Sequence, residues 1–262
     1  MSDGVLEFHI TARYGATTVL DGVSSRIERG QIAALAGLSG SGKSTMALAL
    51  LRLLQYRGGS VSGSIRLEGQ ELMGLSESQM RGVRGRRIGY VPQNPTAALN
   101  GRLRVRTLLD ETWRAHEAGA CPEAMVQALL SNVNLPADAE FREKKAGDLS
   151  TGQGQRLLIA LALMHKPALV IADEPTSALD VITQAAVLSL FGEINRKLGT
   201  AILFISHDLL SVASIAHRVD ILHQGKIVES GAPAELFGAP RHPFTQELVA
   251  AMPRGPRAGA GG

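Results

Sequence analysis

The stretch GLSGSGKST at residues 37–45 decides the fold. It directly follows the apolar run IAALA at residues 32–36 and opens the helix-favouring run MALALLRLL at residues 46–54. This order of strand, loop and helix matches the pattern G-x-x-x-x-G-K-[ST], in which backbone N–H groups turn inward around phosphate oxygens. The alternative, a small-residue turn that only joins a strand to a helix, rarely carries the whole pattern in this context. The sequence therefore predicts a binding site for a nucleoside triphosphate.

The side chains of this loop suit a phosphate chain and its metal ion. Lys43 can reach the β and γ phosphates, and the hydroxyl of Ser44 can ligate Mg²⁺. The N-terminus of the following helix adds a partial positive charge. We expect the nucleotide to be held by Gly37, Ser39, Gly40, Ser41, Gly42, Lys43, Ser44 and Thr45.

Two adjacent carboxylates follow a second apolar run, in LVIADEP at residues 169–175. An acidic pair before a proline is usually a solvated turn. A buried parallel strand, however, delivers such residues to the edge where doubly wound sheets bind their ligands. Asp173 would hold Mg²⁺ through its water shell, and Glu174 would polarise the attacking water.

The alternation of strand-like and helix-like segments predicts an α/β fold with a largely parallel sheet. The clearest strands are residues 32–36, 88–91, 169–172 and 201–206. Before the last of these, Val187, Leu190, Ile194 and Leu198 recur at helical spacing, and Gly199 is a helix stop. The segment 95–166 favours helices and reads as a helical insert in the α/β core.

Polar residues also end the two remaining strands, since Gln93 follows IGYVP and His207 follows AILFIS. Alone, a loop amide and a surface histidine would be the ordinary interpretations. All four strands, however, deliver a residue suited to phosphate or metal at the same end. We therefore expect Gln93 and His207 to lie near Lys43 and Glu174.

Composition excludes several other classes of protein. The chain has 262 residues with 45% hydrophobic content, and no apolar run approaches the roughly 18 residues of a membrane-spanning helix. The start MSDGVLEFHI lacks the features of an export signal, so we expect a cytoplasmic protein.

The single cysteine, Cys121, is predicted to be an ordinary, partly buried thiol. The net charge is only +3. The densest basic run consists of Arg81, Arg84, Arg86 and Arg87 and is most simply a solvated loop. We therefore expect no nucleic-acid partner.

The stretch LSTGQGQR at residues 149–156 allows two interpretations. Ser150 with Gln153 three residues later predicts a capping box that starts the next helix. A helix that opens with Ser150, a small residue at Gly152 and free N–H groups is also suited to binding an anion.

Taken together, these motifs resemble the ATP-binding cassette family of transporter ATPases, whose signature is typically L-S-G-G-Q. The resemblance runs from Tyr14 to about residue 252, with the motifs in the family's order. It implies a P-loop NTPase (RecA-like) core at residues 4–94 and 167–231, beginning with an antiparallel β region. It also implies a helical subdomain at 95–166 and a C-terminal extension at 232–252, followed by a flexible tail at 253–262.

The resemblance implies ATP and Mg²⁺ as ligands and assigns the functional residues. Catalysis would depend on Glu174, His207, Gln93 and Lys43, and the metal would be held by Ser44, Gln93 and Asp173. Two subunits would sandwich ATP head to tail. Beyond the phosphate loop, the nucleotide would therefore contact Tyr14, which stacks on adenine, and the partner-facing residues Ser150, Gly152, Gln153 and Asp180.

Longer stretches, such as YVPQNPTAALN and GKIVESGAPAELFGAPRHPFTQELVAAMP, look like the ATPases of peptide and nickel importers. Many peptide members have a cysteine-rich C-terminal extension, which this sequence lacks, so it is similar to the short nickel or metallophore type. The resemblance implies a permease, a substrate-binding protein acting through it, and a place at the cytoplasmic face of the membrane. It favours a second, different ATPase subunit over a second copy of this chain.

One residue departs from the family's pattern, since Thr151 replaces the first signature glycine. A β-branched side chain is stiffer and bulkier, so the site that uses this signature is expected to be the slower one. Two other functions stay open. One is a regulatory subunit that binds ATP with weak hydrolysis, and the other is a related ATPase that acts on DNA.

Overall fold

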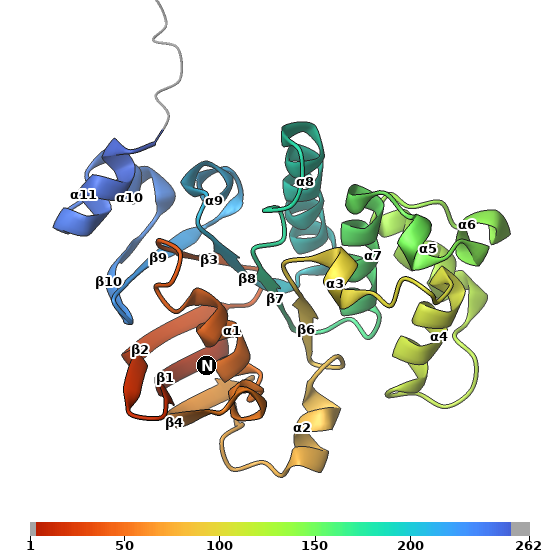
Figure 1. Ribbon diagram of the computed structural model, residues 1–262, viewed down its shortest axis with the longest axis horizontal. Helices are drawn as coiled ribbons and strands as arrows, with labels where there is room; N and C mark the ends of the chain where they lie inside the picture. Colours follow the sequence, from red (N-terminus) through yellow and green to blue (C-terminus); the bar gives the residue numbers. More distant parts are fainter. Residues whose placement is uncertain (1–3, 253–262) are drawn as a thin grey trace, which may run out of the picture.

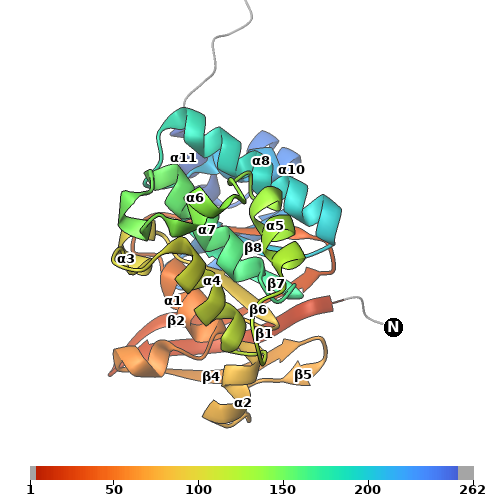
Figure 2. The ribbon, with the colours of Figure 1, turned by 90° about the vertical axis from the view of Figure 1, so that its right-hand side faces the viewer.

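Two β-sheets and a group of helices make up the fold (Figure 1), and this computed structural model describes residues 4–252. The predicted tail at residues 253–262 lies outside the described residues. Figure 2 shows the antiparallel sheet at the bottom, the larger sheet in the middle and helix α8 (Val181–Leu198) at the top. The predicted α/β class with an N-terminal antiparallel region is confirmed.

The smaller sheet is antiparallel and has the strand order β2-β1-β4-β5. Its strands are β1 (Gly4–Tyr14), β2 (Thr17–Glu28), β4 (Gly59–Leu67) and β5 (Gln70–Glu71). Along β1 the residues Leu6, Phe8, Ile10 and Ala12 are buried at every second position. This period of two gives the sheet one apolar face, which packs on the core.

The larger sheet has the order β10-β9-β3-β8-β7-β6, with β10 the antiparallel edge strand. The four predicted strands are confirmed as β3 (Ile32–Ala36), β6 (Ile88–Val91), β7 (Leu169–Asp173) and β8 (Ala201–Ser206). They pair in parallel, so their carboxyl ends meet at one edge. Two further strands, β9 (Arg218–His223) and β10 (Lys226–Gly231), extend the sheet.

Alternate residues of the parallel strands face two separate cores. On one side Ala33 and Leu35 pack with helix α1 (Lys43–Leu50) and the smaller sheet. On the other side Ala34 and Ala36 pack with α8 and the helical region. Because both faces are covered, the strands are continuous apolar runs, as parallel sheets require.

Residues 95–166 form helices that lie beside β6, at the right-hand side of Figure 1. They are α3 (Pro95–Ala98), α4 (Val105–Arg114), α5 (Glu123–Asn132), α6 (Ala139–Glu143), η2 (Ala146–Asp148) and α7 (Thr151–Leu163). Between α4 and α5, Cys121 is partly buried, as predicted, and burial raises the pKa of its thiol. The protonated thiol is therefore an unreactive group.

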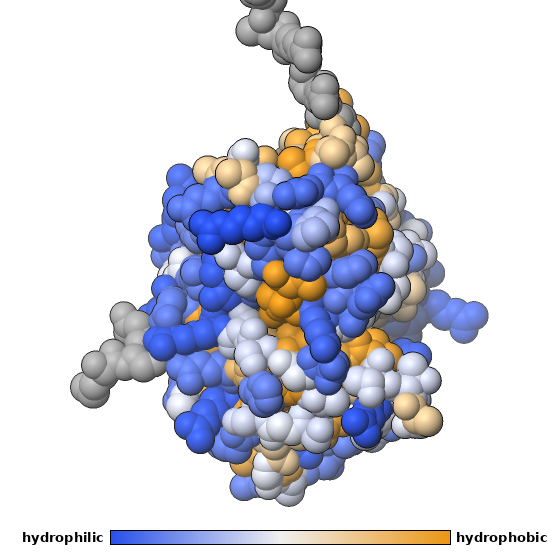
Figure 3. Space-filling model, turned by 90° about the vertical axis from the view of Figure 1, so that its left-hand side faces the viewer, coloured by the Kyte–Doolittle hydropathy of each residue, from blue (hydrophilic) through white to orange (hydrophobic). Residues whose placement is uncertain are grey.

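The remaining helices are η1 (Leu54–Arg57), α2 (Glu77–Val83), α9 (Leu209–Ile215), α10 (Pro233–Gly238) and α11 (Pro243–Ala250). The last two lie beside β10, in blue in Figure 1. Among residues 4–252, no helix has the length and apolar character needed to span a membrane. One face of the molecule carries hydrophilic residues interspersed with small hydrophobic patches (Figure 3).

Helix α8 follows the prediction except at its end. Gly199 stops it in a left-handed conformation, with φ of 66°, and Val187, Leu190 and Ile194 are buried as the spacing indicates. Leu198, however, is 45% exposed. Leu198 lines a cavity at the start of β7 and β8 instead of packing in the core, so periodicity alone overestimated the buried stripe.

Candidate functional site

The loop at residues 37–45 leads from the carboxyl end of β3 into α1, as predicted. It borders a cavity of 350 Å³. The residues that line this cavity are Val19, Ser39, Gly40, Gly42, Lys43, Ser44, Thr45, Gln93 and Glu174. The structure therefore joins the loop to residues from β2, from the end of β6 and from the end of β7.

Two glycines are required by the shape of this loop. Gly42, just before α1, has φ of 107°, a region that side chains disfavour. As a glycine it offers no side chain to cap the first N–H groups of the helix, which leaves them available to an anion. At Gly37, a β-carbon would come 2.3 Å from the carbonyl oxygen of Leu222. The loop can follow this path only with glycine at both positions.

Lys43 is buried, with 5% of its surface exposed, and its amine lies inside the loop. The Nζ atom donates to the carbonyl oxygens of Gly37 and Leu38 at 2.9 and 3.0 Å. It also lies 3.6 Å from Oε1 of Glu174. The cation is thus fixed between the backbone of the loop and the second carboxylate of the acidic pair.

Asp173 is buried, and each of its carboxylate oxygens accepts a hydrogen bond from a hydroxyl. Ser44 Oγ donates to Oδ1 over 3.2 Å, and the hydroxyl of Tyr90 donates to Oδ2 over 3.4 Å. Burial raises the pKa of Asp173, although the bond from Ser44 opposes this. Burial and the neighbouring Asp173 raise the pKa of Tyr90 far above its ordinary value, so its phenol keeps its proton.

This donor set fits a magnesium ion. Hydroxyl and carboxylate oxygens are the hard ligands that Mg²⁺ prefers, and it is usually held by one or two carboxylates with water and phosphate oxygens. Ser44 and Asp173 already face one another. The residues present would therefore hold the ion between the loop and the end of β7.

Glu174 lies at the centre of a polar network. Its backbone φ of 46° is unusual for a residue other than glycine, and it turns the chain sharply where β7 ends. The Oε2 atom lies 2.9 Å from Nδ1 of His207 and accepts a bond of 3.4 Å from Nε2 of Gln93. Gln93 also donates to the hydroxyl of Ser177 over 3.2 Å. The four residues predicted to act in catalysis therefore lie together.

The sequence did not single out Tyr90 or Val19 at this site. Tyr90 lies inside the strand IGYV, where an aromatic residue is ordinary, and its hydroxyl could be placed only by knowing that β6 adjoins β7. Ser177 had a signal, because it lies in the turn directly after the acidic pair. Val19 comes from the smaller sheet, which no local pattern connects to the loop.

The signature residues are not part of this cavity. Ser150 and Gln153 form the predicted capping box, with bonds of 3.2 and 3.1 Å between backbone and side chain. Ser150 lines a separate hollow of 70 Å³ against α3. Gly152 packs closely on α8, since a β-carbon there would come 2.7 Å from Cγ2 of Thr183.

Two further predicted contacts also lie apart from the cavity. Asp180 caps α8 and accepts hydrogen bonds from the backbone of Ile182 and Thr183 and from the Thr183 hydroxyl. Tyr14 ends β1, where it pairs with Thr17 and packs in part against the core between the sheets. The roles of Asp180 and Tyr14 toward ATP stay predictions.

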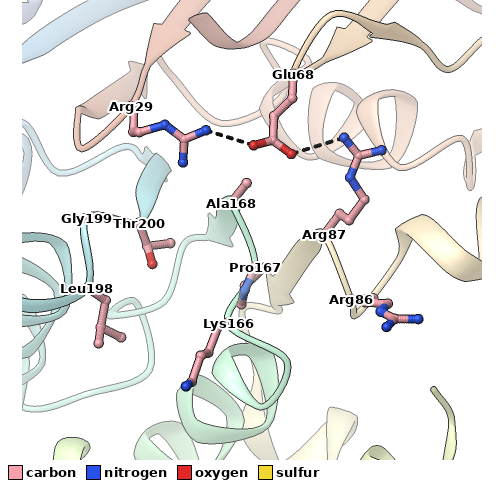
Figure 4. A pocket seen from close by; sticks show the side chains of 10 residues that line it. All are labelled: Arg29, Glu68, Arg86, Arg87, Lys166, Pro167, Ala168, Leu198, Gly199 and Thr200. Carbon is pink, nitrogen blue, oxygen red and sulfur yellow. Dashed lines mark hydrogen bonds and ion pairs between the residues drawn. The ribbon is translucent and has the colours of Figure 1, made fainter. Parts of the chain in front are cut away.

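A second cavity, of 320 Å³, lies where β7 and β8 begin, at the opposite edge of the larger sheet (Figure 4). Its lining is basic, but two of its three arginines are engaged in holding turns together. Arg29 and Arg87 both donate to the carboxylate of Glu68, over 2.8 and 3.1 Å. None of the residues predicted to bind nucleotide lines this cavity.

The basic run beside this cavity was predicted to be a solvated loop, and that prediction was wrong for two of its four members. Arg84 is 16% exposed, donates to the carbonyl of Leu51 over 2.7 Å and pairs with Glu77. Arg87 joins Glu68, as described above. The other two are exposed: Arg81 lies in α2, and Arg86 pairs with Glu117 over 3.3 Å. The run therefore anchors the segment before β6 to its neighbours.

Known proteins resemble this chain over most of its length. The family model for ABC transporters matches residues 20–177. The oligopeptide transport ATP-binding protein OppD of Bacillus subtilis is 40% identical over 242 residues, which is 91% of this chain and 68% of OppD. The glutathione import ATP-binding protein GsiA of Salmonella typhimurium is 40% identical over 240 residues. That alignment covers 88% of this chain but 38% of GsiA.

Solved structures show the same fold. CbiO1 of Clostridium perfringens, part of the ABC transporter complex cbiONQ, aligns with a TM-score of 0.78 and 27% identity, covering 91% of this chain and 92% of that one. The ATP-binding cassette MJ0796, in a dimeric structure bound to ADP and Pi, aligns with a TM-score of 0.73 and 24% identity, covering 87% and 98%. The chain therefore belongs to the ABC transporter family, as an ATP-binding protein of the type that hydrolyses ATP.

Proposed function

We propose that this protein is the energy-coupling ATPase of an ABC importer of small peptides. The relatives at 40% identity are named for oligopeptide transport and glutathione import, which supports peptides as the cargo. Import of nickel or metal chelates, which the family resemblance also allowed, is not named for either of these relatives. The cargo itself is chosen by a binding protein and a permease, with which this chain would work at the cytoplasmic face of the membrane.

The observation that carries the proposed chemistry is the position of Glu174. Its carboxylate borders the cavity of the phosphate loop and is held by Lys43 and His207. A water molecule between this carboxylate and a bound γ-phosphate would lose its proton to Glu174 as it attacks. Mg²⁺, when bound at Ser44 and Asp173, supplies charge neutralisation for the phosphate oxygens.

The other residues of the site orient rather than react. Lys43 and the N–H groups of the loop bind the phosphates. His207 fixes one oxygen of Glu174, and Gln93 reaches the same oxygen from the segment that enters the helical region. Gln93 is thus suited to report the position of the helical region, where the permease would dock, to the catalytic carboxylate.

A second subunit completes the site in this proposal. The cavity beside the phosphate loop contains no residue of LSTGQ from the same chain, which supports a signature supplied by a partner. Nucleotide would then couple to transport because it binds the closed pair of subunits in preference to the open one.

Thr151 is exposed at the first position of α7. Unchanged turnover in the assembled transporter after Thr151→Gly would contradict the slower site that we infer for this signature.

The proposed hydrolysis is tested by Glu174→Gln, which keeps the size of the side chain but removes the proton acceptor. We expect the variant to bind ATP as the wild type does and to release phosphate at least about a hundredfold more slowly. Phosphate release and nucleotide binding are measured on the same preparations. Wild-type turnover in the variant would show that Glu174 is not the general base. If the wild type did not bind ATP, the proposed function itself would be refuted.

A further inference from the structure

We propose that Tyr90 is a positioning residue for Asp173 and prepares this carboxylate for the magnesium ion. The inference rests on the proposed function, because it assigns a role within the same ATP site. It concerns a hydroxyl that neither the phosphate loop nor the acidic pair supplies. Tyr90 itself would contact neither the nucleotide nor the reacting atoms.

The pairing of strands brings the two residues together. β6 lies parallel to β7, with Tyr90 opposite Ile171 and Val91 opposite Ala172. From this position the hydroxyl of Tyr90 lies 3.4 Å from Oδ2 of Asp173. Asp173 is 5% exposed, so little water can replace this donor. A buried carboxylate oxygen without a partner would be costly.

Each of the two hydroxyl donors contacts a different oxygen of the Asp173 carboxylate. Ser44 holds Oδ1 from the loop side, and Tyr90 holds Oδ2 from the sheet side. With both oxygens engaged, the carboxylate plane cannot rotate freely, so the orientation needed by the metal is set in advance. Because metal ligands depend on such outer partners for their orientation, removing one typically weakens metal binding.

The alternative is that Tyr90 only fills space in the core and does not position Asp173. The ring of Tyr90 is partly buried against the core between the sheets, and any aromatic ring would serve that purpose. A phenylalanine keeps the ring and removes the hydroxyl alone. The variant Tyr90→Phe therefore separates the packing of the ring from the positioning of Asp173 by the hydroxyl. The matched control is Tyr56→Phe, at an exposed tyrosine that makes no contact described at this site.

The experiment measures binding of a non-hydrolysable ATP analogue by titration calorimetry, once with excess Mg²⁺ and once with EDTA. We expect Tyr90→Phe to bind the metal-free analogue as the wild type does, and the magnesium complex roughly three- to tenfold more weakly. The KM for magnesium-ATP should rise by the same factor, with a smaller effect on kcat. Tyr56→Phe should match the wild type throughout.

Each other outcome overturns the inference in a distinguishable way. Equal dependence on Mg²⁺ in Tyr90→Phe and in the wild type would show that the hydroxyl does not position Asp173. Weaker binding under both conditions, with a lower melting temperature, would show a structural role only. If the wild type bound the analogue under neither condition, the proposed function would fail first, and the role of Tyr90 with it.

Discussion

The Nδ1 atom of His207 lies 2.9 Å from Oε2 of Glu174, although the two residues end different strands and are 33 positions apart in the chain. β7 and β8 are parallel neighbours, and their carboxyl ends bring the two side chains to one point. Glu174 is 13% exposed and His207 is 49% exposed. The carboxylate is therefore enclosed, while the imidazole that holds it remains open to a partner.

We expect His207→Ala to lower hydrolysis by about a hundredfold while leaving ATP binding nearly unchanged. The imidazole fixes Glu174 and is not among the residues that line the cavity of the phosphate loop. Phosphate release and nucleotide affinity are measured side by side. His9→Ala, at an exposed histidine on β1, is the control and should behave as the wild type. A fall in affinity equal to the fall in turnover would contradict a role limited to orienting Glu174.

The close packing of Gly152 on α8 predicts a specific cost for a side chain at this position. In Gly152→Ala the new methyl group would lie 2.7 Å from Cγ2 of Thr183. Because the opposing atom is the tip of a side chain, we expect the free energy of unfolding to fall by about 1 kcal/mol. Denaturant unfolding measures this change.

Thr183→Ser provides the matching rescue. It removes the opposing methyl group and keeps the hydroxyl that donates to Asp180. The double variant Gly152→Ala, Thr183→Ser should recover most of the lost stability, since the two changes act on one contact. Equal losses with and without the serine would show that the clash is not the cause.

The lowered pKa of Glu71 predicts how the stability of the fold depends on pH. Burial alone would raise its pKa, but the Ser64 hydroxyl and the backbone N–H groups of Met73 and Ile65 donate to it and lower the pKa to about 2. The folded protein thus binds this proton less readily than the unfolded chain, whose ordinary value is 4.5. The contribution to stability is present above pH 4.5 and is lost as the pH falls toward 2.

Glu71→Gln should therefore destabilise the protein at pH 7 and converge on the wild type as the pH falls through this window. Denaturant midpoints at a series of pH values measure the difference between the two proteins. Glu140→Gln, at an exposed position in α6, is the control. A difference that stays constant from pH 7 to pH 3 would exclude the ionised carboxylate as its source.

Local chemistry in the sequence determined a large part of this protein. The loop at 37–45, the four parallel strands and the capping box of Ser150 are each set by residues adjacent in the chain, through backbone freedom at glycine, apolar runs and short-range hydrogen bonds. Because the strands are parallel, the sequence also indicated that Lys43, Gln93, Glu174 and His207 would meet.

Only the tertiary structure decided which side chains contact one another across elements. Strand order brought the Tyr90 hydroxyl to Asp173, a contact between residues 83 positions apart. Packing of the turn before β6 on the turn between β4 and β5 brought Arg87 to Glu68, although the run of charges indicated a solvated loop. Such contacts depend on distance in space and on exclusion of water, and neither is encoded in the spacing of residues along the chain.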